Sequence, residues 1–189
     1  MTDIHKRPKR AKEKLFEAYI TLLQLKDSQS ITIQQLTRTA RVNRVTFYKH
    51  FKNSNNFHEQ FLQHYIENLY QYMKPLNYKP YEKGFEYTAL VDLLEYILAH
   101  KNHYHLLFTS ENIPDFNKSL LSYFRQKITK HTEELAKFHF PGIDVHQEIV
   151  SWYGVSALFG TIIMWAHSNF KYSPVQLAQS IMHLTPSEQ

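Results

Sequence analysis

The chain contains no cysteine and only four glycines among its 189 residues. Without cysteine it forms no disulfides and performs no thiolate chemistry, which fits a reducing cytoplasm. So few glycines disfavour an all-β fold, which needs glycine in its turns, and a glycine-rich phosphate-binding loop. No apolar run follows the basic residues near the first residue, so we expect no signal peptide. Since 43% of the residues are hydrophobic, the chain can form a real core, and we expect a cytoplasmic globular protein.

Positive charge is concentrated in the first third of the chain. Residues 1–60 hold 12 Lys and Arg against 5 Asp and Glu, and residues 61–189 hold 10 against 12. A basic segment attached to a mildly acidic remainder is typical of a module that binds a polyanion. The charge balance therefore favours a nucleic-acid-binding function.

The stretch from Thr32 to Phe51 predicts two short helices joined by a tight turn, which is a helix-turn-helix. Thr32 and Gln35 have the spacing of a capping box at the start of the first helix. Asn43 is a favourable N-cap for the second helix, and Phe47 lies four residues before Phe51, so both rings should pack inward.

A helix that begins at Asn43 with a free first turn can enter a DNA major groove end-on. Arg44 can then form two hydrogen bonds to a guanine, and Val45 can touch a thymine methyl group. Hydroxyls of Thr46 and Tyr48 can donate to phosphates, where lysines nearby supply positive charge.

The run Ala40-Arg41-Val42-Asn43-Arg44-Val45-Thr46-Phe47-Tyr48-Lys49-His50-Phe51, with Ile33 and Leu36 before it, resembles the DNA-binding region of the TetR family of transcriptional regulators. The similarity covers residues 9–62. It implies three DNA-binding helices followed by a larger helical domain that dimerises and usually holds a ligand pocket. The chain departs from the family pattern at Arg41, where glycine is common, at Thr37, where alanine is usual, and at Ser54-Asn55, where a lysine and an acidic residue are usual.

We therefore predict an all-α fold of about nine helices, with a DNA-binding domain over residues 1–52 and a dimerisation and ligand-binding domain over residues 53–189. The predicted DNA-binding residues are Thr32, Gln34, Arg41, Asn43, Arg44, Val45, Thr46, Tyr48, Lys49, His50 and Lys52.

Apolar residues recur at helical spacing through the rest of the chain. They predict helices over residues 53–74, 85–101 and 114–138, and a short helix around Tyr104. A further helix should start at Asp144, with Gln147 completing a capping pair, and a last one should follow the cap Ser173.

The stretch from Ile149 to Ala166 has eighteen residues without a charge. A helix that is apolar on all sides suits a subunit interface, and two such helices can pair with their copies in a homodimer. We expect the interface to contain Trp152, Val155, Phe159, Ile162, Ile163 and Leu177. Eighteen residues also approach the length of a membrane span, which leaves a membrane-tethered adaptor as an alternative.

Two further sites are predicted in the second domain. An apolar ligand pocket should involve Tyr87, Tyr96, Phe108, Phe124 and Trp152. His100, His103 and His105 have spacings that could bind zinc, so a metal-responsive regulator is the second alternative.

The sequence shows no catalytic motif, so we predict a protein that is not an enzyme and needs no cofactor. The expected function is that of a homodimeric transcriptional repressor, which binds a palindromic operator in double-stranded DNA and is released by a small-molecule effector. The sequence specifies neither the operator nor the effector, and it leaves activation as the other possible sign of regulation.

Overall fold

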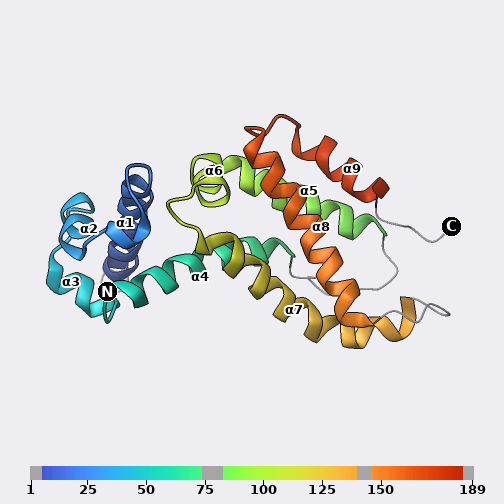
Figure 1. The fold of residues 1–189 in the computed structure, drawn as a ribbon, viewed down its shortest axis with the longest axis horizontal. Coiled ribbons are helices and arrows are strands. Elements are labelled where there is room, and N and C mark those ends of the chain that lie inside the picture. Colours follow the sequence, from blue (N-terminus) through green and yellow to red (C-terminus); the bar gives the residue numbers. More distant parts are fainter. Residues whose placement is uncertain (1–5, 74–82, 140–145, 185–189) are drawn as a thin grey trace. The chain divides into compact units, whose positions relative to one another are not determined.

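The computed structural model describes residues 6–73, 83–139 and 146–184, and every regular element in these ranges is a helix (Figure 1). The predicted all-α fold is confirmed. In chain order the helices are α1 (Lys6–Leu23), the short 3-10 helix η1 (Ser28–Ser30), α2 (Ile33–Thr39), α3 (Arg44–His50), α4 (Ser54–Met73), α5 (Lys83–Ala99), α6 (Lys101–Thr109), α7 (Asp115–His139), α8 (Gln147–His167) and α9 (Pro174–Leu184).

The helices form two compact units. The N-terminal unit comprises Met1–Tyr65 together with Ser110–Pro114, and the C-terminal unit comprises Ile66–Thr109 together with Asp115–Gln189. This division by contacts falls within α4. The functional boundary between residues 52 and 53 stays a prediction.

The N-terminal unit is built on the apolar face of α1. Its buried residues on that face are Leu15, Ala18, Tyr19, Leu22 and Leu23. The ring of Phe16, also buried, lies edge-on to Phe57 with centroids 5.6 Å apart, and Phe51 meets Phe57 at 4.9 Å. Such aromatic pairs each add about 0.5–1.5 kcal/mol beyond the area that they bury. The aromatic cluster therefore fixes α3 and the first part of α4 against α1.

The C-terminal unit packs α8 against α6 and α7, and α5 against α9. The inner face of α5 buries Leu93, Leu94 and Ile97. Phe124 of α7 and Phe159 of α8 are both fully buried, with ring centroids 4.4 Å apart. Burial of large side chains from α5, α7 and α8 gives this unit its own hydrophobic core.

The ends of two helices test the capping predictions. At α9 the prediction is confirmed, because the Gln176 backbone N–H donates to the Ser173 hydroxyl at 3.3 Å and the Ser173 N–H donates to Gln176 Oε1 at 3.0 Å. At α8 the helix begins at Gln147, later than the predicted start, and the residue before it, His146, makes no side-chain cap; the predicted capping pair itself stays a prediction. Asp144, the predicted partner, lies outside the described residues.

Candidate nucleic-acid interface

The first helix of the helix-turn-helix, α2, is started by the predicted capping box. Thr32 Oγ1 accepts from the Gln35 backbone N–H at 3.2 Å, and the Thr32 N–H donates to Gln35 Oε1 at 3.1 Å. Two backbone donors of the first turn are satisfied in this way. Thr32 and Gln34 remain exposed, so both can reach a partner outside the chain.

The turn after α2 is a Schellman motif with Arg41 at its left-handed position. The Arg41 N–H donates to Arg38 O at 3.1 Å, and the Val42 N–H donates to Thr37 O at 2.9 Å. Arg41 has a φ of 52°, where a side chain costs about 1 kcal/mol relative to glycine. The departure from the family's glycine therefore places backbone strain in this turn.

Thr37, the second departure from the family pattern, is buried yet satisfied. Its exposed fraction is 4%, and its hydroxyl donates to Ile33 O within the same helix at 2.8 Å. Because the hydroxyl pays no penalty for a missing partner, threonine replaces alanine here without disrupting α2.

The second helix, α3, is capped and anchored as predicted. Asn43 Oδ1 accepts from the Val45 backbone N–H at 2.8 Å. Phe47 is fully buried and Phe51, at the end of the helix, is 1% exposed. The two rings fix one side of α3 to the core, so the opposite side must face outward.

The outward side of α3 carries cations and large contact groups. Val45 is 63% exposed and Tyr48 is 51% exposed, which is unusual for such apolar side chains. Arg44 and Lys49 are also exposed, whereas Thr46 and His50 are partly covered. The arrangement presents a guanidinium, a methyl surface and a hydroxyl from the first turns of one helix, which is the set of groups that reads base edges.

The start of α4 adds a polar network that begins at Asn53. Asn53 Oδ1 accepts from the Asn56 N–H at 2.8 Å, and Asn56 Oδ1 in turn accepts from the Lys52 N–H at 3.2 Å and from Gln60 Nε2 at 3.0 Å. Lys12 Nζ donates to Gln60 Oε1 at 3.0 Å. The side chain of Lys52 is left exposed beside this network, as a phosphate contact requires. The asparagine and glutamine spacing from residue 53 to residue 60 was the available signal.

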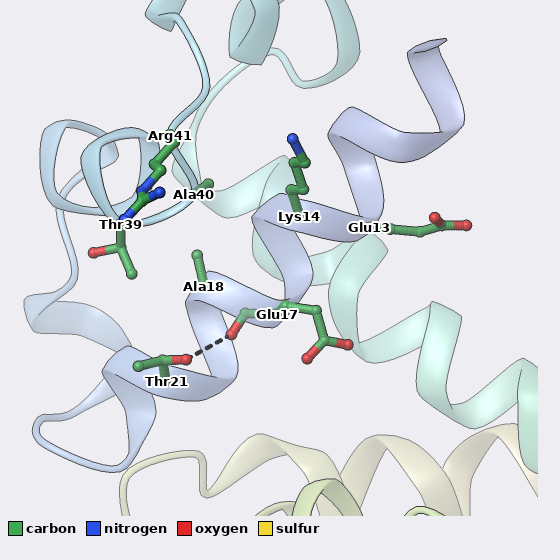
Figure 2. Close-up of a pocket in the computed structure, with 8 residues that line it drawn as sticks. All are labelled: Glu13, Lys14, Glu17, Ala18, Thr21, Thr39, Ala40 and Arg41. Atoms are coloured by element: carbon green, nitrogen blue, oxygen red, sulfur yellow. Dashed lines mark hydrogen bonds between the residues drawn. The ribbon is translucent and has the colours of Figure 1, made fainter. Parts of the chain in front are cut away.

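An open groove of ≈ 610 Å³ lies between α1 and the end of α2 (Figure 2). Ala18 and Ala40 are its buried small residues. Its other lining residues are Glu13, Lys14, Glu17, Thr21, Thr39 and Arg41. Its lining therefore carries two carboxylates, Glu13 and Glu17, and two cations, Lys14 and Arg41.

The residues predicted for a ligand pocket occupy different environments. Phe108 and Phe124 are buried in the aromatic core, and Tyr87 is partly exposed. Tyr96 stacks on Tyr72 at 4.5 Å, and burial raises the pKa of its hydroxyl above the ordinary value. Trp152 is 45% exposed. The pocket stays a prediction.

The three histidines at the α5–α6 junction do not form a cluster. Within the described residues, no group of three or more His, Cys, Asp or Glu side chains is placed to hold a metal ion. His100 Nδ1 instead lies 2.9 Å from Tyr96 O, and the His105 ring lies beside Phe170 at 6.2 Å. The metal-responsive alternative, which needs His100, His103 and His105 together, has no support in this geometry.

Four of the six residues predicted for the dimer interface are covered by their own chain. Val155, Phe159, Ile162 and Leu177 are at most 8% exposed, so they have no surface to offer a partner. Ile163 is partly exposed, and Trp152 retains the exposure that an interface needs. The sequence did not identify the apolar side chains that do face outward on α8 and α9: Ile149, Tyr153, Met164, Val175 and Leu184.

The uncharged run of α8 was also considered as a membrane span. None of the helices, as far as the structure describes them, combines the length and hydropathy that crossing a bilayer demands. The helix α8, which contains Ile149–Ala166, is among those that fall short.

Residues 86–187 match the TetR-type family model described as "Transcriptional regulator C-terminal region". No curated protein matches the chain. Among solved structures, a TetR transcriptional regulator from Streptococcus agalactiae superposes with a TM-score of 0.67 at 18% identity, covering 97% of this chain and 97% of that one.

Two further structures share the fold. NalD from Pseudomonas aeruginosa, described as the secondary repressor of the MexAB-OprM multidrug efflux pump, gives a TM-score of 0.66 at 16% identity over 94% of this chain and 95% of its own. The regulator FadR from Bacillus subtilis, in complex with stearoyl-CoA, gives 0.60 at 15% identity over 91% and 96%. At these identities the likeness establishes the fold alone.

Proposed function

We propose a function for this chain from one premise: it belongs to the TetR family of transcriptional regulators and is therefore a DNA-binding regulator. The proposal is that two copies bind one palindromic operator in the cytoplasm, each placing the first turn of α3 in a major groove. The exposure of Arg44 and Val45, on a helix whose other side is held by Phe47, is the observation that carries it. Two recognition helices related by a two-fold axis match the symmetry of a palindrome.

Each exposed group around α3 has a task in this proposal. Arg44 reads a guanine with two hydrogen bonds, and Val45 packs on a thymine methyl group. Lys49 and Lys52 neutralise phosphates. These contacts to the DNA backbone fix the register of the protein on the duplex. The predicted contact of Arg41 is with a phosphate. Thr32 and Gln34, at the start of α2, are predicted to reach the DNA backbone or a base.

The second copy is proposed to dock on the outward face of α8 and α9. Tyr153 is 75% exposed and Met164 is 66% exposed, and Trp152 lies on the same helix. Exposed apolar groups gathered on one pair of helices are characteristic of protein interfaces. The helix pair of one protomer with that of the other would form a four-helix interface.

The sign of regulation is proposed as repression relieved by a small molecule. NalD is described as a repressor, and the FadR structure contains stearoyl-CoA, so relatives of this fold carry both properties. A ligand that binds one arrangement of the C-terminal unit more tightly would shift the population of DNA-binding dimers.

Selection of bound sequences from a random duplex pool tests the proposal. We expect a palindrome whose half-sites are separated by about 10 base pairs, or a multiple of that, centre to centre. Arg44→Ala should weaken specific binding by about 10- to 100-fold and relax selection at one position of each half-site. Lys118→Ala, which removes an exposed cation from α7, is the matched control and should bind as the wild type does. Equal affinity for selected and random duplex would refute the proposal.

A further inference from the structure

The five residues Ser110–Pro114, which connect α6 to α7, belong by their contacts to the N-terminal unit. The residues on either side, Thr109 and Asp115, belong to the C-terminal unit. The chain therefore enters the N-terminal unit a second time, after it has left through α4. We call Ser110–Pro114 the clasp.

Asn112 makes the polar contacts of the clasp. Its Nδ2 donates to the backbone oxygen of Leu23 at 2.7 Å, and its own backbone oxygen accepts from the Ser28 N–H at 2.8 Å. Leu23 is the last residue of α1, so Asn112 satisfies one of the carbonyls that a helix end leaves without an intrahelical donor. The next residue, Ile113, adds an apolar contact, because it is 1% exposed.

These contacts hold the connection between α1 and the helix-turn-helix. Ser28 begins η1, and Ile31, which follows η1, is 8% exposed. Thr32, the N-cap of α2, is the next residue. A displacement of the clasp therefore acts on the backbone that leads directly into α2.

The residues on the two sides of the clasp are joined to each other within the C-terminal unit. Asn117, in the first turn of α7, donates from Nδ2 to Phe108 O at the end of α6 at 2.9 Å. Its buried Oδ1 accepts no hydrogen bond. An asparagine amide can form several hydrogen bonds, but here Asn117 holds the junction of α6 and α7 through the Nδ2 bond alone. The buried Oδ1 without a donor is unfavourable.

We propose that the clasp is a second link between the two units and that Asn112 is its positioning residue. Movement of α6 against α7 is passed through the covalent chain to Asn112, then through its hydrogen bonds to Leu23 and Ser28, and from there to α2. The DNA-binding helices are thereby controlled at two points, through α4 and through the clasp. The coupling itself is independent of the proposed function, and its use in regulation rests on that function.

Two optical probes separate the units in one experiment. Both tryptophans, Trp152 and Trp165, lie in the C-terminal unit, so tryptophan fluorescence reports on that unit, whereas far-ultraviolet circular dichroism reports on all helices. The test variant is Asn112→Asp, which keeps the side-chain shape but removes the donor to Leu23 O. Asn102→Asp, an exposed position in α6, introduces the same charge as a matched control.

In the wild type and in Asn102→Asp we expect the two thermal midpoints to coincide. In Asn112→Asp the tryptophan midpoint should stay, while the dichroism signal should gain an earlier transition about 5 °C lower, as expected when one buried hydrogen bond is lost from a small domain. Hydrogen exchange should accelerate at the amides of residues 24–31 and not within α8. A common fall of both midpoints, or no change beyond that of the control, would overturn the proposal.

A DNA arm tests the regulatory use. With an operator duplex from the selection, binding should raise the tryptophan midpoint of the wild type more than that of Asn112→Asp. Equal increases in the two proteins would overturn the regulatory role. If no operator is found, the proposed function fails, and the experiment without DNA still decides whether the clasp couples the units.

Discussion

The exposed face of α3 and the exposed face of α8 differ in the side chains that they present. Around α3 the exposed groups include cations, a hydroxyl and one aliphatic group, whereas those of α8 include Trp152, Tyr153 and Met164. Cations on a short anchored helix suit a polyanion, because they attract its phosphates even across the surrounding water. Apolar groups gain free energy only when another surface removes them from water. The two faces therefore call for different partners, DNA for one and protein for the other.

Each face is supported by the core of its own unit. The α3 face rests on Phe47, which is fully buried in the N-terminal unit, and the α8 face rests on Phe159, which is fully buried in the C-terminal unit. Each phenylalanine packs on other rings, Phe47 on Phe51 at 5.3 Å and Phe159 on Phe124 at 4.4 Å. Removing either ring should damage one face and spare much of the other.

The largest expected effect comes from this matched pair. Phe47→Ala and Phe159→Ala should each lower the free energy of unfolding by about 3–5 kcal/mol, because each leaves a cavity in a core. Phe47→Ala should abolish DNA binding and lower the urea midpoint of tryptophan fluorescence less than Phe159→Ala does. If both variants lower that midpoint equally, the two faces are supported by one cooperative core and the comparison fails.

The next effect tests the partner of the α8 face. Tyr153→Asp places a charge where the proposed second copy removes water, and truncation of such an aromatic anchor costs about 2 kcal/mol or more. The dissociation constant of the dimer should then rise by about 30-fold or more, measured by sedimentation velocity over a range of concentrations. Ser122→Asp, at an exposed position of α7, is the charge control and should leave the dimer intact. An unchanged dissociation constant in Tyr153→Asp would show that the partner docks elsewhere.

The same two regions show how much of the structure can be predicted from the sequence. Thr32, Asn43 and Phe47 were predicted correctly because their signals are local: a cap acts on a backbone donor two or three residues away. The roles of these residues follow from spacing alone.

In α8 the spacing carried no such information. A helix that is apolar on every side does not reveal which side its own chain covers, and Phe159 was predicted outward while Tyr153 was overlooked. Only packing against α6 and α7 settles the choice. The clasp was likewise hidden, because Asn112 and Leu23 are 89 positions apart and share no local pattern.

A smaller effect sharpens the local side of the comparison. Asn43→Ala removes the cap of α3 and should lower the free energy of unfolding by about 1 kcal/mol in urea titrations followed by circular dichroism. Asn55→Ala, at an exposed position in the first turn of α4, should change it far less. Equal losses in the two variants would mean that the Asn43 Oδ1 bond to the Val45 N–H contributes nothing specific.

The smallest effect is expected at Arg41, where a side chain destabilises the turn but the guanidinium is proposed to bind DNA. Its φ of 52° disfavours any side chain, so Arg41→Gly should raise the free energy of unfolding by about 0.5–1 kcal/mol relative to Arg41→Ala. Both variants lose the guanidinium equally. If Arg41 contacts a phosphate, both should bind the operator more weakly, with the slope of log affinity against log salt reduced by about 1.

The loss of affinity at Arg41 should be smaller than that in Arg44→Ala, because Arg41 is proposed to contact a phosphate and Arg44 to read a base with two hydrogen bonds. Urea titration and binding at three salt concentrations, on the same two variants, separate the effects. Equal stability of the glycine and alanine variants would show that the turn is unstrained. An unchanged salt slope would show that Arg41 faces no phosphate.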